Sequence, residues 1–298
     1  MKILLATDGS EYSNGAAKFL TCLNLSPDDE ITVFHAVYWI PFLYNTESYL
    51  ETFKEIKKEM APRIIDSASK ILKPVKAKIS TAIIDGSPEQ SIIEVAARSD
   101  IDLVVMGARG IKGIESLFIG SVTRSVAINS PKPVLIIKLP VSEHPDKMKI
   151  LFASDGSEYS IATGEFLCGM PFPDHTEITI LNVMPSEFLD MPKTLMAEIS
   201  QRIAEVLLTE RRHAVSASEW IVDEAAAFLS KRFKNINVLS KAGDPSSEIL
   251  KTAEGLKTDV ITVGCRGLRG IRGMMGSVSR NILIHSKCSV LIGKTCQE

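Results

Sequence analysis

Long apolar runs are missing from this chain. No stretch approaches the roughly 18 apolar residues that a membrane-spanning helix needs, and the first apolar run, MKILL, is too short for a signal-peptide core. Cysteines are few as well: the five are scattered without CxxC spacing, which argues against a disulfide framework and a zinc site. We therefore expect a cytoplasmic protein with no membrane partner and no metal site.

Excess charge of either sign is also missing. The formal net charge is −2 and the isoelectric point is near 6.3, so no overall field attracts a polyanion. We therefore expect no nucleic-acid partner. With 298 residues, 45% hydrophobic and 23% charged, the composition is that of a soluble globular chain long enough for two domains.

The dominant feature that is present is an internal repeat. Residues 2–20, KILLATDGSEYSNGAAKFL, return at residues 149–167 as KILFASDGSEYSIATGEFL. Residues 85–110, DGSPEQSIIEVAARSDIDLVVMGARG, are echoed at residues 242–267 by AGDPSSEILKTAEGLKTDVITVGCRG. The same blocks in the same order predict two homologous domains.

The segment between the repeats predicts a linker. Residues 139–148, LPVSEHPDKM, carry two prolines and several charges, which are typical of a connection between domains. We therefore place the first domain at residues 1–138 and the second at residues 149–298.

Short apolar runs alternate with longer amphipathic segments in each half. Such alternation predicts parallel strands joined by crossover helices. In the first half we expect strands at 3–7, 31–37, 77–84, 103–106 and 133–138, and helices at 10–23, 46–72 with a break near Pro62, 88–98 and 121–129. In the second half we expect strands at 150–154, 178–183, 238–241, 260–263 and 290–293. The crossover at 192–234 fits either one extended helix or two.

Runs such as LVVM and VLII are apolar on both faces, as in central parallel strands that helices cover on each side. The predicted fold class is therefore α/β: two tandem doubly wound domains, each an open, mostly parallel five-stranded sheet with helices on both faces. Ligands in such sheets bind beyond the carboxyl ends of the strands. Because Asp8, Ala36 and Gly107 lie at expected strand ends, we expect them to converge on one crevice.

Two glycine-rich segments, here called the glycine loops, follow the fourth strand of each half. The first, residues 106–123, is MGARGIKGIESLFIGSVT, and the second, residues 263–279, is VGCRGLRGIRGMMGSVS. Glycines let backbone N–H groups approach a ligand, and a helix N-terminus attracts anions, so the pattern fits a phosphate cradle. The alternative is a long loop whose glycines serve only as turns and caps.

Together with the ATDGS segment of the first strand, the first loop resembles the nucleotide-binding members of the universal stress protein family. That family carries G-x2-G-x9-G-[ST] after its fourth strand and an aspartate at the end of its first strand. Gly107, Gly110, Gly120 and Ser121 match this spacing, and Asp8 matches the aspartate. The resemblance covers nearly the whole chain and implies an ATP-type site in each nucleotide-binding domain.

The resemblance implies roles for residues of the first domain. Asp8 would flank the adenine, as a carboxylate able to accept from its exocyclic amine. From the residues alone, Asp8 could equally be the N-cap of the first helix. The site residues carried over for the first domain are Ala6, Thr7, Asp8, Ala36, Met106, Gly107, Arg109, Gly110, Gly120, Ser121 and Val122.

The second domain departs from the family spacing. Nine residues separate Gly110 from Gly120, but eight separate Gly267 from Gly276, so a donor could be displaced there. The corresponding residues are Ser154, Asp155, Val183, Val263, Gly264, Arg266, Gly267, Gly276, Ser277 and Val278. Arg109 and Arg266 are the best candidates to neutralise phosphate, ahead of Lys112, Arg124, Arg269, Arg272 and Arg280.

No residue pattern commits the chain to catalysis, since no general base is evident for a terminal phosphate. We therefore expect an adenine-nucleotide-binding stress-response protein, for ATP or AMP/ADP and possible Mg²⁺, that acts as a sensor or regulator through occupancy. A slow nucleotide hydrolase or adenylyl-transfer enzyme and a nucleotide-free interaction scaffold are the alternatives. The resemblance further implies an intrachain pseudo-dimer through the last strands, PVLIIK and SVLIGK, and a homodimer of chains.

Overall fold

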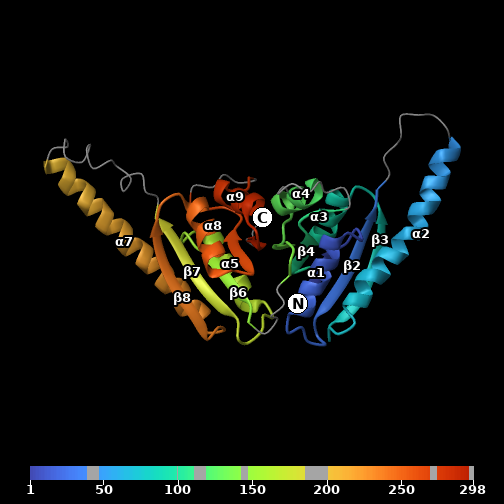
Figure 1. Ribbon diagram of the computed structural model, residues 1–298, viewed down its shortest axis with the longest axis horizontal. Helices are drawn as coiled ribbons and strands as arrows, with labels where there is room; N and C mark the ends of the chain where they lie inside the picture. The colour runs from blue at the N-terminus through green and yellow to red at the C-terminus, as the bar shows by residue number, and fades with distance from the viewer. Residues whose placement is uncertain are drawn as a thin grey trace.

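In the computed structural model, the strands found among the described residues join one sheet (Figure 1). The structure describes residues 1–38, 47–98, 100–110, 119–141, 147–184, 201–268 and 274–294. The strands are β1 (Lys2–Ala6), β2 (Glu30–Val37), β3 (Lys78–Asp85), β4 (Leu103–Gly107), β5 (Val134–Ile137), β6 (Lys149–Ala153), β7 (Glu177–Met184), β8 (Asn235–Ala242), β9 (Val260–Gly264) and β10 (Ser289–Gly293). Their order is β3-β2-β1-β4-β5-β10-β9-β6-β7-β8 in a ten-stranded sheet. Pairing is parallel within each half, which confirms the predicted fold class.

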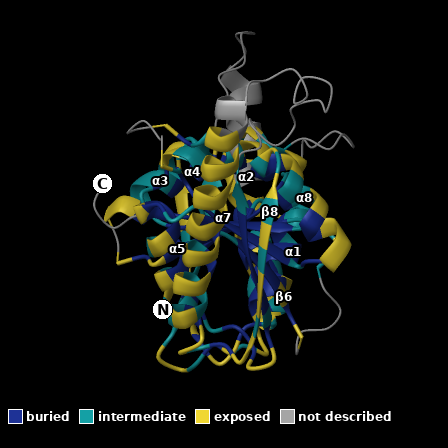
Figure 2. Ribbon diagram, turned by 90° about the vertical axis from the view of Figure 1, so that its left-hand side faces the viewer, coloured by how far each residue is buried: buried dark blue, intermediate teal, exposed yellow. Residues whose placement is uncertain are grey.

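Helices cover both faces of the sheet. They are α1 (Glu11–Thr21), α2 (Glu47–Ile71), α3 (Pro88–Arg98), α4 (Ser121–Asn129), α5 (Glu158–Gly169), α7 (Gln201–Leu229), α8 (Pro245–Leu256) and α9 (Ser277–His285). One buried cluster draws on α1, α2, α5 and α7, and the other mainly on α3, α4, α8 and α9. Figure 1 shows α2 and α7 at the two outer ends of the molecule, and Figure 2 shows exposed residues along much of α7.

Helix α2 differs from the sequence expectation, and α7 bears on the expectation left open for the second crossover. The break predicted near Pro62 is wrong, because α2 runs through this proline. Pro62 removes one backbone hydrogen bond, but it lies on the exposed side of α2, where water can reach the carbonyl left without a partner. The described part of the second crossover is one helix, α7; residues 185–200 lie outside the described residues.

Burial explains the order of the strands. Every residue of β4, β5, β9 and β10 is buried, whereas the outermost strands β3 and β8 have mostly exposed or half-exposed residues. Strands that are apolar on both faces gain most from burial, at about 25 cal/mol per Å² of apolar surface. The four strands that are buried along their whole length therefore occupy the centre of the sheet, where both halves meet.

The two halves meet through antiparallel pairing of β5 with β10. Leu291 pairs with Leu135, and the flanking pairs are Val290 with Ile136 and Ile292 with Val134. This pairing confirms the intrachain pseudo-dimer through the last strands. It also removes two apolar sheet edges that would otherwise invite pairing with other chains.

Each half also supplies a lysine to the other half. The Nζ atom of Lys138, just after β5, donates to the carbonyl oxygens of Leu283 (3.0 Å) and Ser286 (2.5 Å) at the C-terminal end of α9. Lys294, just after β10, donates to the carbonyl of Ile128 (3.0 Å) in α4. A cation at a helix C-terminus satisfies unpaired carbonyls and opposes the negative end of the helix dipole. Lys294 thus caps a helix of the opposite half, as Lys138 does.

Burial lowers the pKa of Lys138 to about 8; the nearby Cys288 partly offsets this lowering, and Arg109 adds a smaller lowering. The unfolded lysine has a pKa of about 10.4, so the unfolded chain binds more protons between these values. The contribution of Lys138 to the free energy of unfolding therefore rises with pH across this window.

We expect Lys138→Met to lose more stability, relative to the parent protein, in alkaline solution. The relative loss should grow by about 2 kcal/mol from about pH 7.5 to about pH 9.5, measured by urea unfolding. The control is Lys70→Met, which changes an exposed lysine on α2. A relative loss that is the same at both pH values would contradict the assignment.

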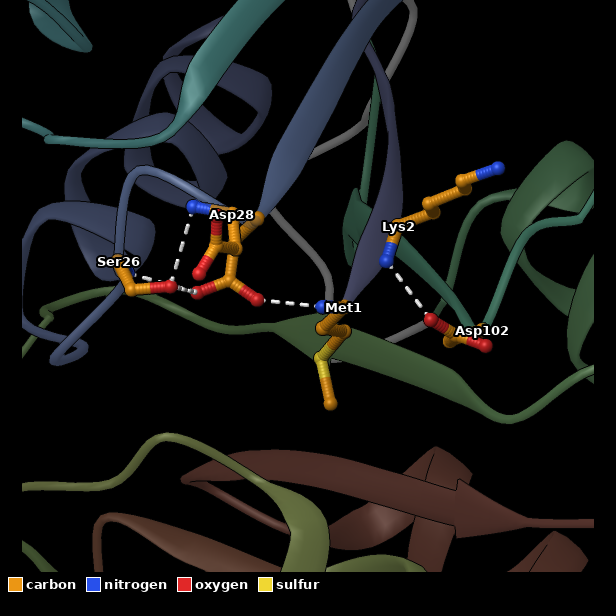
Figure 3. A network of polar contacts seen from close by, with 6 residues as sticks. Met1, Lys2, Ser26, Asp28 and Asp102 are labelled. Atoms are coloured by element: carbon orange, nitrogen blue, oxygen red, sulfur yellow. Dashed lines mark hydrogen bonds and ion pairs between the residues drawn. The ribbon is translucent and has the colours of Figure 1, made fainter.

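At the amino ends of β1 and β6, aspartates accept hydrogen bonds from backbone N–H groups. Asp102 Oδ2 accepts from the N–H of Lys2, and Asp259 Oδ2 accepts from the N–H of Lys149, both at 2.7 Å. Figure 3 shows the first of these contacts beside Met1, Ser26 and Asp28. The repeat of this bond in both halves shows that the duplicated sequence folds in the same local way.

The Asp29 carboxylate accepts from the amino group of Met1 and from Ser26. Burial raises the pKa of Asp29, but these hydrogen bonds outweigh that effect and hold the pKa below its ordinary value. The resulting stability is lost as the pH falls through the folded-state pKa.

None of the helices in the described ranges combines the length and the apolar character needed to cross a membrane.

Two buried hydroxyls in the described part of the second half, those of Thr176 and Thr262, have no hydrogen-bond partner. Thr262 in β9 is fully buried, and its Oγ1 atom is unpaired. The corresponding residue of the first half, by the repeat of residues 85–110 and 242–267, is Val105, also fully buried. A buried hydroxyl without a partner costs about 1–3 kcal/mol.

We therefore expect Thr262→Val to raise the free energy of unfolding by about 1 kcal/mol, since valine has the same shape without the hydroxyl. Urea unfolding measures the change. The reciprocal variant Val105→Thr should lower the stability by a similar amount. A loss of stability in Thr262→Val would show that the hydroxyl has a partner in solution.

Candidate functional site

A cavity of about 660 Å³ opens at the carboxyl ends of β1, β2 and β4 in the first half. Residues from α2 and α3 and the start of α4 complete its wall. All the site residues predicted for this half line it: Ala6, Thr7, Asp8, Ala36, Met106, Gly107, Arg109, Gly110, Gly120, Ser121 and Val122. The expected convergence of Asp8, Ala36 and Gly107 on one crevice is therefore observed.

The cavity wall also contains residues that sequence reasoning missed. His35 and Tyr38 come from β2 and its end, Met60 and Ile64 from α2, and Glu89 from the first turn of α3. The residues on α2 had no motif to mark them, because only folding brings this helix over the strand ends. His35 had a weak signal: it precedes Ala36, the residue already singled out.

Asp8 shapes the turn after β1 but does not cap α1. Its Oδ1 atom accepts from the N–H of Ser10 (3.0 Å), and the N-cap is Ser10, whose Oγ accepts from the N–H of Ser13 (3.2 Å). The N-cap alternative for Asp8 is therefore wrong. Ser10 directly precedes α1 and reaches the N–H of Ser13, the third residue of the helix. Asp8 lies two residues too early in the chain to accept that hydrogen bond.

Two glycines of the first loop are required by packing. A Cβ atom at Gly110 would collide with Asp8 Oδ2, and one at Gly107 would lie 2.6 Å from the backbone of Tyr12. Gly107 thus lets β4 and α1 approach, and Gly110 lets the loop approach the carboxylate. Gly267 stands against Asp155 in the same way in the second half.

Gly120 differs because a Cβ atom there would make only ordinary contacts of 3.5 Å or more. It is the N-cap of α4, with extended backbone and no side-chain cap, and Gly276 is the corresponding cap of α9. The other helices with a described N-cap, α1, α5 and α8, are capped by Ser10, Ser157 and Asp244. The start of α4 therefore presents its first N–H groups to the cavity.

The start of α4 is held in place from β4. Thr123 Oγ1 donates to the carbonyl of Gly107 (2.8 Å), and Ser279 Oγ repeats this bond to Gly264 (2.6 Å) in the second half. The hydroxyl at this position could have been found from the sequence, since both glycine loops carry a Ser or Thr there.

His35 is oriented by a hydrogen bond between its Nδ1 atom and the carbonyl of Thr7 (2.8 Å). A carbonyl only accepts, so Nδ1 carries the proton in this contact. In the second half Asn182 Nδ2 donates to the carbonyl of Ser154 (2.7 Å). Both side chains therefore fix the backbone immediately before the site aspartate.

Arg109 lies at the loop end of the cavity. Its guanidinium carbon is 5.4 Å from the centre of the Tyr12 ring, in cation–π contact, and the side chain is half-buried. This is the one arginine or lysine among the described residues of the cavity wall. Lys112 lies outside the described residues, and Arg124 is exposed on α4.

The second half repeats the backbone plan around Asp155. Asp155 Oδ1 accepts from the N–H of Ser157 (3.1 Å), and Oδ2 accepts from the N–H of Leu268 (3.1 Å). Ser154 follows β6, Val183 lies in β7, Val263 and Gly264 end β9, and Gly276, Ser277 and Val278 begin α9. The predicted second-site residues thus stand at the same strand and helix ends.

The candidate phosphate-binding arginines of the second half have described partners or lie outside the described residues. Arg266 is only 8% exposed and is bound to Tyr159 and to the carbonyl of Met274. Arg280 donates to the carbonyl of Met275 (3.3 Å). Arg269 and Arg272, and with them the shortened part of the loop, lie outside the described residues.

The repeated fold and site agree with the comparison with known families. The model of the Universal stress protein family matches residues 1–138 and again residues 148–294. The chain belongs to the universal stress protein family.

Two relatives each match about half of this tandem universal stress protein, and one solved structure matches nearly all of it. Universal stress protein MJ0531 of Methanocaldococcus jannaschii is 34% identical over 143 residues, which is 48% of this chain and 84% of that protein. A universal stress protein of Thermus aquaticus is 29% identical over 136 residues, 46% of this chain and 97% of that protein. Among solved structures, a universal stress protein of Archaeoglobus fulgidus has a TM-score of 0.63 at 22% identity, covering 98% of this chain and 96% of that one. This last likeness concerns the fold alone.

Gly110→Ala should destabilise the protein, because its Cβ atom would collide with the Asp8 carboxylate. We expect a loss of about 1–3 kcal/mol in urea unfolding, the usual cost of overpacking. Gly120→Ala is the matched control and should change stability little. Asp8→Ala added to Gly110→Ala should recover part of the loss; equal losses in Gly110→Ala and Gly120→Ala would contradict this packing role.

Proposed function

We propose that the first half of this universal stress protein binds an adenine nucleotide, ATP or AMP/ADP, and that occupancy regulates the protein as a sensor. The observation that carries the proposal is the cavity itself. It has the carboxylate of Asp8 among its lining residues and the helix start at Gly120 and Ser121 in its wall. Its volume of about 660 Å³ lies in the usual range for small-molecule sites.

The phosphates would bind at the start of α4. Backbone N–H groups there have no side-chain cap, and the positive end of the helix dipole favours an anion. The Ser121 hydroxyl adds a donor, and Arg109 adds positive charge from the facing end of the loop. Magnesium belongs to the proposal as the ion that accompanies nucleotide phosphates.

The adenine would bind near Asp8 and Ala36. A carboxylate accepts from an exocyclic amine, and the backbone of β2 at Ala36 offers further hydrogen bonds. Tyr38 and Met60 are 44% and 50% exposed, although both line the cavity. A flat base placed between these apolar side chains would remove their surface from water.

Gly120→Val tests the phosphate end. A Cβ atom fits at this position, but the two methyl groups beyond it would fill the space in front of the helix N–H groups. We expect nucleotide affinity at the first site to fall on the order of 100-fold, as for the loss of a charged hydrogen bond, in isothermal titration calorimetry. Gly276→Val should remove a weaker binding event or none.

Gly120→Ala is the control, since it adds the Cβ atom without the methyl groups. If saturating ATP, ADP and AMP give no heat with the parent protein, and no nucleotide co-purifies, the chain is a scaffold and the proposal fails. Turnover of ATP faster than about one per minute, abolished in Ser121→Ala, would identify an enzyme instead; typical enzymes turn over near ten per second. The cytoplasmic location and the homodimer of chains stay predictions.

A further inference from the structure

The two glycine loops differ in how their arginines are held. Arg266 Nη1 donates to the hydroxyl of Tyr159 (2.7 Å), and Nε donates to the carbonyl of Met274 (2.9 Å). The guanidinium carbon lies 5.2 Å from the centre of the Tyr159 ring. Both side chains are buried, with 8% of each exposed. Arg266 therefore connects three segments of the second half: the end of β9, the first turn of α5 and the end of the glycine loop.

The corresponding arginine of the first half has a different environment. Arg109 stacks over Tyr12, the counterpart of Tyr159, but both residues are half-buried and Arg109 lines the cavity. The residue types and their positions are the same in the two halves, so the motif alone cannot distinguish them. The difference is the depth at which the arginine and tyrosine lie.

The contacts of Arg266 oppose its use as a phosphate ligand. A buried cation is stable only when its N–H groups are paired, and Tyr159 and Met274 provide two such partners. For Arg266 to reach a phosphate in the second site, it must leave these partners and expose the tyrosine hydroxyl. Because Met274 lies two residues before the helix cap Gly276, the same contact also fixes the approach of the loop to α9.

We propose that Tyr159 determines the nucleotide specificity of the second site by holding Arg266 in this buried pair. The proposal rests on the proposed function of the first site, because it assigns the second site a weaker affinity for the same ligand. The Tyr159 hydroxyl is the controlling group: the stacked ring keeps the arginine close, and the hydroxyl oxygen accepts a hydrogen bond from its guanidinium. Nucleotides with more phosphates lose most, since they depend most on the positive charge.

The test measures the second site by itself, in a Gly120→Val background that blocks the first site. Tyr159→Phe is added, which keeps the ring and its stacking but removes the hydroxyl that accepts from Arg266. Binding of ATP, ADP and AMP is measured by isothermal titration calorimetry. We expect ATP to bind about tenfold more tightly after Tyr159→Phe, with a smaller gain for AMP.

Two controls assign the gain to the arginine. Tyr12→Phe in the same background makes the equivalent change in the first half and should leave the second-site affinity unchanged. Arg266→Gln added to Tyr159→Phe should abolish the gain, because no cation remains to reach the phosphate. Circular dichroism verifies that each variant is folded, and if Tyr159→Phe does not fold, Arg266→Gln alone should leave second-site ATP affinity unchanged.

The outcomes separate this proposal from the first one. If no protein binds nucleotide, including the one with an intact Gly120, the proposed function fails. If the first site binds but Tyr159→Phe leaves the second-site affinity for ATP unchanged, only the role of Tyr159 is overturned. A fall in second-site affinity after Tyr159→Phe, or in Arg266→Gln alone, would also overturn it, because it would show that the buried pair supports binding.

Discussion

The antiparallel pairing of β5 with β10 is the interaction on which the rest of the structure depends. It joins two doubly wound halves into one sheet and places their fully buried strands at the centre. Lys138 and Lys294 then cross the junction to cap α9 and α4. The N-termini of these two helices stand at the two candidate sites. Each half therefore caps the C-terminal end of the helix that stands at the candidate site of the other half.

The two candidate sites share a backbone plan but differ in the environment of one arginine side chain. In both halves a glycine lies against the site aspartate, a second glycine caps a helix without a side chain, and a Ser or Thr hydroxyl ties that helix to the preceding strand. What differs is the environment of the arginine between the first two glycines: Arg109 lines a cavity, whereas Arg266 is buried against Tyr159. Duplication therefore preserves the backbone of the proposed phosphate site, while packing decides how deeply the arginine beside it is buried.

The glycine loops also show that one residue type serves several needs. Gly107 is required because α1 lies against β4, and Gly110 because the Asp8 carboxylate lies against the loop. Of the described glycines in the first loop, Gly120 alone has room for a Cβ atom and stands at a helix start without a side-chain cap. The glycine pattern is thus partly a packing pattern. The alternative that the glycines are structural holds for Gly107 and Gly110, and it leaves room for a ligand beside Gly120.

The sequence by itself determined the repeat, the α/β class, the succession of strands and helices in the first half and the residues that meet at the first cavity. It could do so because apolar runs, caps and glycine spacing are local signals. It could not place Met60 and Ile64 over the strand ends, keep α2 continuous at Pro62, or separate Ser10 from Asp8 as the helix cap. Those outcomes depend on which surfaces meet and which groups stay in water. The depth of Arg266 is of the same kind: only tertiary packing decided that one of two equivalent arginines lies beneath a tyrosine, because burial is a property of the folded surroundings and not of the motif.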